Sequence, residues 1–125
     1  MLKTLFMIGT GGALGSILRY LTGVTFTRHA SNGFPFGTFT VNLIGCLLIG
    51  LLAGWIEHRQ WLTLEWRYFL MIGLLGGFTT FSSYGLETLQ LIRADQHLVA
   101  ITYAVASVIA GLALAGLGFW LGAVK

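Results

Sequence analysis

Four long apolar stretches constrain this chain more than any other feature of its sequence. They cover about residues 5–24, 38–56, 68–92 and 98–124, and each approaches or exceeds the roughly 20 residues that an α-helix needs to cross a bilayer. The chain is 56% hydrophobic and only 9% charged, and its mean hydropathy is +0.84, which is untypical of soluble globular domains. We therefore predict an all-α membrane protein in which residues 1–125 form a single domain of four transmembrane helices.

The third stretch contains a run that is unusual for a transmembrane helix, Gly76-Gly77-Phe78-Thr79-Thr80-Phe81-Ser82-Ser83. Backbone groups left unpaired in hydrocarbon cost several kcal/mol each, so non-helical backbone at membrane depth persists only where it is buried in protein, binds an ion or lines a watery cavity. The two glycines and four hydroxyls predict that the third helix is broken near mid-membrane. The break is the strongest indication of a functional site in the sequence.

Basic residues are divided almost equally between the two sides of the predicted bundle, although orientation normally follows a bias of lysine and arginine. Two hypotheses stay open. In one, the chain inserts in both directions and pairs as an antiparallel dimer; in the other, it has one orientation with both termini in the cytoplasm. The side of the termini holds Lys3, Arg59, Arg67 and Lys125, and the other side holds Arg28, Arg93 and the nearby Arg19.

Several classes of function find no support in the composition. The net charge of +3 comes from scattered residues and forms no basic run, so no nucleic-acid partner is expected. Cys46 is the only cysteine, which excludes an intramolecular disulfide. The histidines lack metal-ligand spacing, and no nucleophile accompanies a base, so we do not expect an enzyme. Glycine pairs such as Gly50/Gly54 and Gly118/Gly122 predict close helix packing.

Asn42 lies about one helical turn into the second stretch and is a candidate binding residue. Its amide has two N–H donors and could join helices together or bind an anion. Phe81 and Tyr84 follow the break three residues apart. Because an aromatic ring has a positive edge, such rings can attract an anion edge-on, although ordinary packing is the alternative.

Hydroxyl-bearing and charged side chains continue along the third and fourth stretches. Their spacing of three or four residues places them on single helical faces, where they could form a hydroxylated track or bond back to their own helix. An acidic group within a span, here Glu87, is by default a functional-site hypothesis, with a position near the headgroups as its alternative. Arg19 could reach the headgroups or line an anion vestibule. The stripes are Thr80, Ser83, Tyr84 and Glu87 on the third stretch, and Tyr103 and Ser107 on the fourth.

Three motifs resemble those of the Fluc (CrcB) fluoride channel family: the spacing from Gly15 to Arg19, the run Thr38-Phe39-Thr40-Val41-Asn42-Leu43-Ile44-Gly45, and the run Gly76 to Ser82. The resemblance covers the whole chain. It implies an antiparallel, dual-topology homodimer with two pores in a microbial inner membrane. Such a dimer would export fluoride passively.

The resemblance also implies roles for individual residues. Asn42 and Phe81 match the pore asparagine and first pore phenylalanine of the family, whereas Tyr84 stands where the family usually has a second phenylalanine. Gly76 and Thr79 match the positions whose backbone carbonyls, from both subunits, hold a structural Na⁺. The pore lining, its acidic companion and the arginine of the first span correspond to Ser82, Ser83, Tyr103, Ser107, Glu87 and Arg19.

Two other classes of protein are alternatives to the channel. A small multidrug resistance-type, proton-coupled exporter also has four spans and dual topology, but it needs a carboxylate in the first span, where this chain has Arg19. A non-transporting assembly or regulatory subunit would leave Asn42, the break and Glu87 without a shared task.

Overall fold

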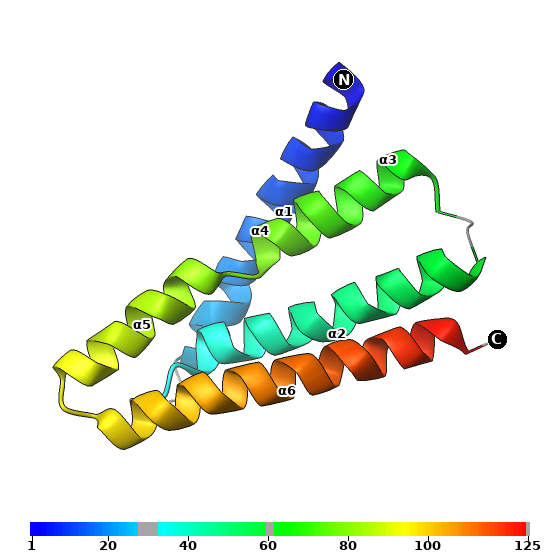
Figure 1. The fold of residues 1–125 in the computed structure, drawn as a ribbon. Coiled ribbons are helices and arrows are strands. Elements are labelled where there is room, and N and C mark those ends of the chain that lie inside the picture. Colours follow the sequence, from blue (N-terminus) through cyan, green and yellow to red (C-terminus); the bar gives the residue numbers. More distant parts are fainter. Residues whose placement is uncertain (28–32, 60–61, 125) are drawn as a thin grey trace.

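The computed structural model describes residues 1–27, 33–59 and 62–124. All regular structure in these residues is helical, with no strand among them, which confirms the predicted all-α class. Figure 1 shows the chain as a small set of long helices. In chain order they are α1 (Leu2–Thr27), α2 (Phe36–Arg59), α3 (Leu64–Arg67), η1 (Tyr68–Leu75), α4 (Gly76–Phe78), α5 (Phe81–Arg93) and α6 (His97–Ala123).

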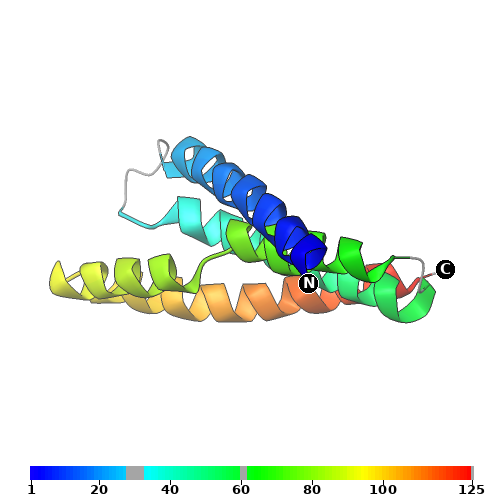
Figure 2. The ribbon, with the colours of Figure 1, turned by 90° about the horizontal axis from the view of Figure 1, so that it is seen from above.

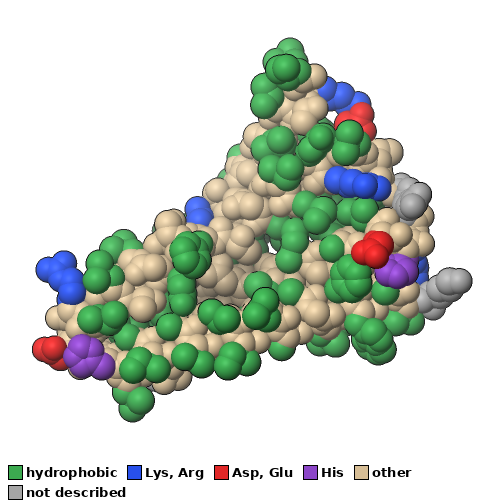
Figure 3. Space-filling view, in the orientation of Figure 1, with side chains coloured by type: hydrophobic (Ala, Val, Ile, Leu, Met, Phe, Trp, Pro, Cys, Tyr) green, Lys and Arg blue, Asp and Glu red, His purple; other side chains and the backbone are tan. Residues whose placement is uncertain are grey.

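Among the described residues, three helical runs are long and apolar enough to cross a membrane: α2, the run Leu64–Arg93 from α3 to α5, and α6. They support a multi-pass membrane protein and correspond to three of the four predicted spans. Helix α1 is also long, at 26 residues, but glycines, hydroxyls and Arg19 make it less apolar than the other three. Figure 3 shows most charged side chains near the ends of the long helices, with apolar and neutral surface between them.

Helices α2 and α6 lie side by side along most of their length (Figures 1 and 2). A Cβ atom at Gly50 or Gly54 would collide with backbone of α6, and one at Gly118 or Gly122 would collide with backbone of α2. The predicted role of these glycines in close packing is therefore confirmed. Their absence of a side chain lets the two backbones touch.

Helix α1 crosses the third helical run (Figure 2). Gly11 and Gly15 of α1 face the backbone of η1 and α4, and a Cβ atom at Gly77 would collide with the backbone of Gly12. The segment η1 is π-helical over eight residues, a wider winding that is rare beyond one turn. The sequence pattern does not predict this winding.

The third helical run is interrupted within the run Gly76 to Ser83, as predicted. Gly76 and Gly77 themselves stay in the helical turn α4. The break consists of Thr79 and Thr80, which have extended backbone angles of φ −83°, ψ 157° and φ −152°, ψ 120°. Gly77 instead lets the helical backbone of α4 lie directly against Gly12 of α1.

Candidate functional site

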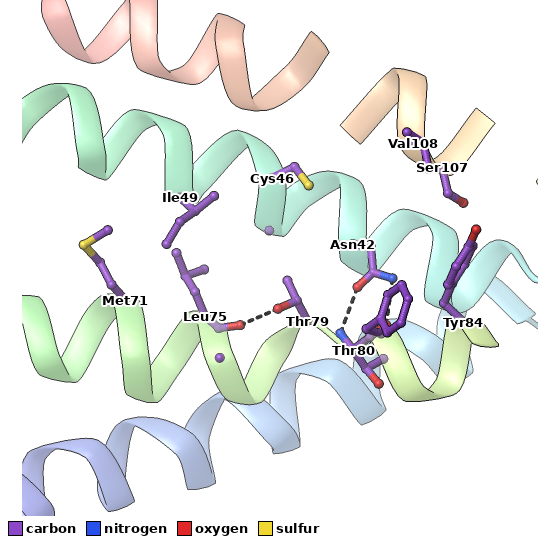
Figure 4. A pocket seen from close by; sticks show the side chains of 13 residues that line it. Asn42, Cys46, Ile49, Met71, Leu75, Thr79, Thr80, Tyr84, Ser107 and Val108 are labelled. Carbon is purple, nitrogen blue, oxygen red and sulfur yellow. Dashed lines mark hydrogen bonds between the residues drawn. The ribbon is translucent and has the colours of Figure 1, made fainter. Parts of the chain in front are cut away.

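The side chain of Asn42 binds the backbone of Thr80 at the break. The Thr80 N–H donates to Asn42 Oδ1 at 2.9 Å, and Asn42 Nδ2 donates to the Thr80 carbonyl at 3.0 Å. Figure 4 shows the amide pointing from α2 directly at this segment. The amide thus pairs with Thr80 as a neighbouring peptide group would, and it satisfies the Thr80 N–H, which the broken helix leaves without a helical acceptor.

This pairing redirects the hydrogen bonds around the break. In an uninterrupted α-helix the Thr80 N–H would donate to the Gly76 carbonyl, and the Ser83 N–H would donate to the Thr79 carbonyl. Here the Ser83 N–H donates instead to Thr80 Oγ1 at 3.1 Å, which caps the start of α5. The last helical donor before the break is the Thr79 N–H, bonded to the Leu75 carbonyl at 3.0 Å. The carbonyls of Gly76 and Thr79 therefore lose their helical partners.

A cavity of about 390 Å³ lies beside the break, between α2, the third helical run and α6. Its polar groups come from Asn42, Thr79, Thr80 and Ser107, and Tyr84 faces them from α5 (Figure 4). The remaining wall is apolar. It consists of Gly45, Cys46, Ile49, Met71, Leu75, Gly76, Phe81 and Val108.

Ser107 is the one described residue whose side-chain oxygen is buried without a hydrogen-bond partner. An unsatisfied buried hydroxyl is costly, so each such group calls for an explanation. Ser107 lines the cavity that contains Asn42. Its hydroxyl is therefore an unused donor beside that cavity.

The two aromatic residues after the break differ in exposure. Phe81 is 83% exposed, so its ring is accessible at the surface of the subunit. The Tyr84 ring is half-buried and lies 5.5 Å from the Phe81 ring, with an angle of 37° between their planes. The two rings form an aromatic edge to the cavity, and both belong to its lining.

Glu87 accepts two short hydrogen bonds from other helices. Thr38 Oγ1 of α2 donates to Glu87 Oε1 at 2.6 Å, and the Tyr103 hydroxyl of α6 donates to Glu87 Oε2 at 2.8 Å. The carboxylate thereby ties α2, α5 and α6 together. Tyr103, expected to line a hydroxylated track, is completely buried, and its hydroxyl hydrogen points to Glu87.

A second cavity, of about 650 Å³, lies on the other side of Thr80. It brings Arg19 of α1 and Glu87 of α5 to the same space, together with Ser83 and Thr38. Ser82 is exposed and contacts the Thr80 hydroxyl at 3.2 Å. Most predicted site residues thus divide into a donor and aromatic group around the first cavity and a charged group around the second, with Thr80 in both linings. Ser82 and Tyr103 line neither of these two cavities.

Three residues near this site were not identified as candidates from the sequence: Thr38, Phe34 and Phe39. Thr38 lies four residues before Asn42, on the same face of α2, and this spacing could have identified it. Phe34 and Phe39 pack around Tyr103, with ring centroids 5.4 and 6.4 Å from its ring. The position of Phe34 depends on the path of the chain before α2, and that of Phe39 on how α2 packs against α6; no sequence period encodes either.

Comparisons with known proteins agree on one family. The profile of a family described as "CrcB-like protein, Camphor Resistance (CrcB)" matches residues 6–119. A protein of Flavobacterium psychrophilum named "Fluoride-specific ion channel FluC" is 44% identical over 111 residues, 89% of this chain and 90% of its own length. A protein of the same name from Caulobacter vibrioides is 47% identical over 113 residues, 90% of this chain and 89% of its own. The chain belongs to the CrcB-like family.

Proposed function

We propose that this chain is a fluoride-selective ion channel that exports fluoride passively across a microbial inner membrane. The name of its relatives, fluoride-specific ion channel, supports this function. The observation in the structure that carries it is the unpartnered Ser107 hydroxyl in the cavity of Asn42. A buried donor without an acceptor suits a small anion that accepts hydrogen bonds strongly.

The first cavity offers three kinds of contact to such an anion. Ser107 supplies a free hydroxyl, and Asn42 has a second N–H beyond the one bonded to Thr80. Phe81 and Tyr84 supply ring edges, which carry partial positive charge. Fluoride is compact and holds its water tightly, so a narrow row of donors can replace that water where a larger halide fits poorly.

The break also orients two helix ends in opposite senses. Helix α4 ends at Phe78 and exposes carbonyl groups, whereas α5 begins at Phe81 and presents its N-terminus. The dipole of a helix favours cations at its C-terminal end and anions at its N-terminal end. The arrangement therefore supports an anion on the side of Thr80 and Ser83 and a cation on the side of Gly76.

We propose a structural Na⁺ held by the Gly76 and Thr79 carbonyls of two subunits. The residues fit this ion, because both carbonyls have lost their helical donors, and a hard cation prefers oxygen ligands. The ion would tie the two broken helices together. An experimental structure of the dimer with bound Na⁺ tests this role; water at that position, bonded to both carbonyls, would contradict it.

The proposed assembly is an antiparallel homodimer in which α1 forms a fourth span and each pore lies between subunits. The exposure of Phe81 supports this arrangement, since a ring 83% exposed in one chain leaves the pore wall incomplete. Exposed apolar residues along α1 and α6 are available to lipid or to the partner. Neither surface is polar enough to face water.

The deciding experiment is fluoride efflux from proteoliposomes that contain the purified chain. We expect rapid electrogenic loss of fluoride with a potassium ionophore present, and no efflux of chloride from matched vesicles. Equal efflux of both halides, or none of fluoride, would refute the function. A proton-coupled exporter would instead require a pH gradient; the absence of any acidic residue from Leu2–Thr27 disfavours it.

A further inference from the structure

The Tyr103 ring is enclosed by other aromatic rings. Phe34 lies against it edge-on, with centroids 5.4 Å apart and planes at 77°, and Tyr84 lies 5.2 Å away on another side. Phe39 completes the enclosure at 6.4 Å. The side chain is 0% exposed, so it can rotate only if one of these rings gives way.

Of these rings, Phe34 alone comes from a connection and not from a helix. It stands between Gly33, whose φ of 75° favours glycine, and Pro35, whose φ is fixed by its ring. The Phe36 N–H donates to the Phe34 carbonyl at 2.8 Å, which tightens the turn. The backbone is therefore restricted on both sides of Phe34, and the ring is held over Tyr103.

Phe34 also stands on one side of Glu87. A third cavity, of about 440 Å³, is lined by Phe34, Thr38 and Glu87 together with residues from the end of α5 and from the connection between α5 and α6. Thr38 and Glu87 also line the second cavity, which contains Arg19. The hydrogen bonds that join Thr38, Glu87 and Tyr103 thus lie between the second and third cavities. Phe34 packs against these residues from the side of the third cavity.

We propose that Phe34 is a positioning residue that holds the Tyr103 hydroxyl on Glu87. The inference rests on the proposed fluoride channel. The hydrogen bond from Tyr103 draws part of the negative charge of Glu87 away from the second cavity, where Thr80 and Ser83 lead from the break. A smaller side chain at position 34 leaves space for Tyr103 to turn away, and the less satisfied carboxylate then repels an anion more strongly.

A double-mutant cycle tests this role. Phe34→Ala and Tyr103→Phe should each lower fluoride flux by a similar factor, roughly fivefold for one lost hydrogen bond. The double variant should be no slower than either single variant, because both remove the same contact. Phe34→Tyr, which keeps the ring, should retain flux.

Assembly is checked by size exclusion for every variant, and Phe34→Leu replaces Phe34→Ala in the cycle if the alanine variant does not assemble. Losses that multiply in the double variant would overturn the inference, as would normal flux in either single variant. Absence of fluoride flux from the unmodified chain would refute the proposed function instead. In that case the same cycle is measured on thermal unfolding. Additive changes there would still overturn the inference that Phe34, through the Tyr103 ring, holds the Tyr103 hydroxyl on Glu87.

Discussion

At Asn42, one amide group serves both the fold and the proposed ion site. Its oxygen and one N–H bind Thr80 across the break, and this leaves one N–H for a ligand. The two hypotheses that the sequence left open for Asn42, joining helices and binding an anion, are therefore compatible. The first is observed in the structure, and the second stays a prediction.

Asn42→Asp should abolish most fluoride flux. The substitution keeps an acceptor for the Thr80 N–H but replaces the donor with an oxygen that faces the Thr80 carbonyl, and an ionised side chain would repel the anion. We also expect a loss of about 1–3 kcal/mol in the free energy of unfolding. Flux is measured in proteoliposomes, and dimer assembly by size exclusion. Near-normal fluoride flux from an assembled Asn42→Asp variant would show that Asn42 does not contact the ion in the pore.

Phe81→Ile separates a ring-edge contact from ordinary packing. Because the ring is 83% exposed in the chain, its removal should change the stability of the subunit little, while loss of the positive edge should lower flux. Tyr84→Phe is the matched control; the structure gives its hydroxyl no hydrogen bond with any described residue, so we expect normal flux. Full fluoride flux through the double variant Phe81→Ile/Tyr84→Ile would show that both rings serve only in packing.

The sequence identified individual residues better than it identified their partners. Asn42, Glu87 and Arg19 stand out because polar groups are costly within apolar stretches. The partner of Asn42 is a backbone segment 38 positions away, and no local pattern encodes that pairing. Tyr103 was expected on a hydroxylated track; helical spacing places a residue on a face, but the enclosing rings of Phe34 and Phe39 decide whether that face is buried.

At the scale of helices, glycine positions determine how closely the backbones pack. A Cβ atom at Gly118 would meet the Leu47 carbonyl of α2, whereas one at Gly116, two residues earlier on α6, would meet nothing within 4 Å. This contrast explains why a glycine pattern predicts the α2–α6 pair correctly. It also provides two substitutions on one helix that differ only in their surroundings.

Gly118→Ala should destabilise the subunit by about 1–3 kcal/mol, because the added methyl group forces α2 and α6 apart. Gly116→Ala should be neutral or slightly stabilising, since alanine favours helix more than glycine does. Thermal unfolding in detergent compares the two variants. Equal behaviour of both would show that α2 and α6 do not pack as closely as described.

The exact position of the break shows the limit of prediction for this element. The run Gly76 to Ser83 predicts an interruption but does not say which of its residues leave the helix. Gly76 and Gly77 stay helical, and Gly77 packs against the backbone of Gly12 in α1. The extended residues are two threonines, whose β-branched side chains suit extended backbone. The Asn42 amide satisfies that backbone from another helix. Tertiary contacts with α1 and α2 therefore override local preference at this point.

For the whole molecule, the aromatic residue at the edge of the first cavity lies on the surface of the subunit. Phe81 is 83% exposed, so its ring is accessible to a neighbouring molecule. The near-equal division of basic residues between the two sides gives insertion no strong preference. Together, these features favour a partner of the same sequence inserted in the opposite direction.

A cysteine appended after Lys125 should therefore be labelled from both sides of the membrane when the chain is expressed alone. Cys46 lines the first cavity, so the test uses a Cys46→Ser background in which only the added thiol reacts.

The matched control adds two positive charges to the side of the termini through Gln60→Arg and Thr63→Arg, which should shift labelling toward one side. This biased variant should also lose flux when expressed alone and regain it with a variant biased the other way, because only opposed copies complete the pores. Labelling of the unbiased chain from one side only, with normal fluoride flux, would exclude the antiparallel homodimer.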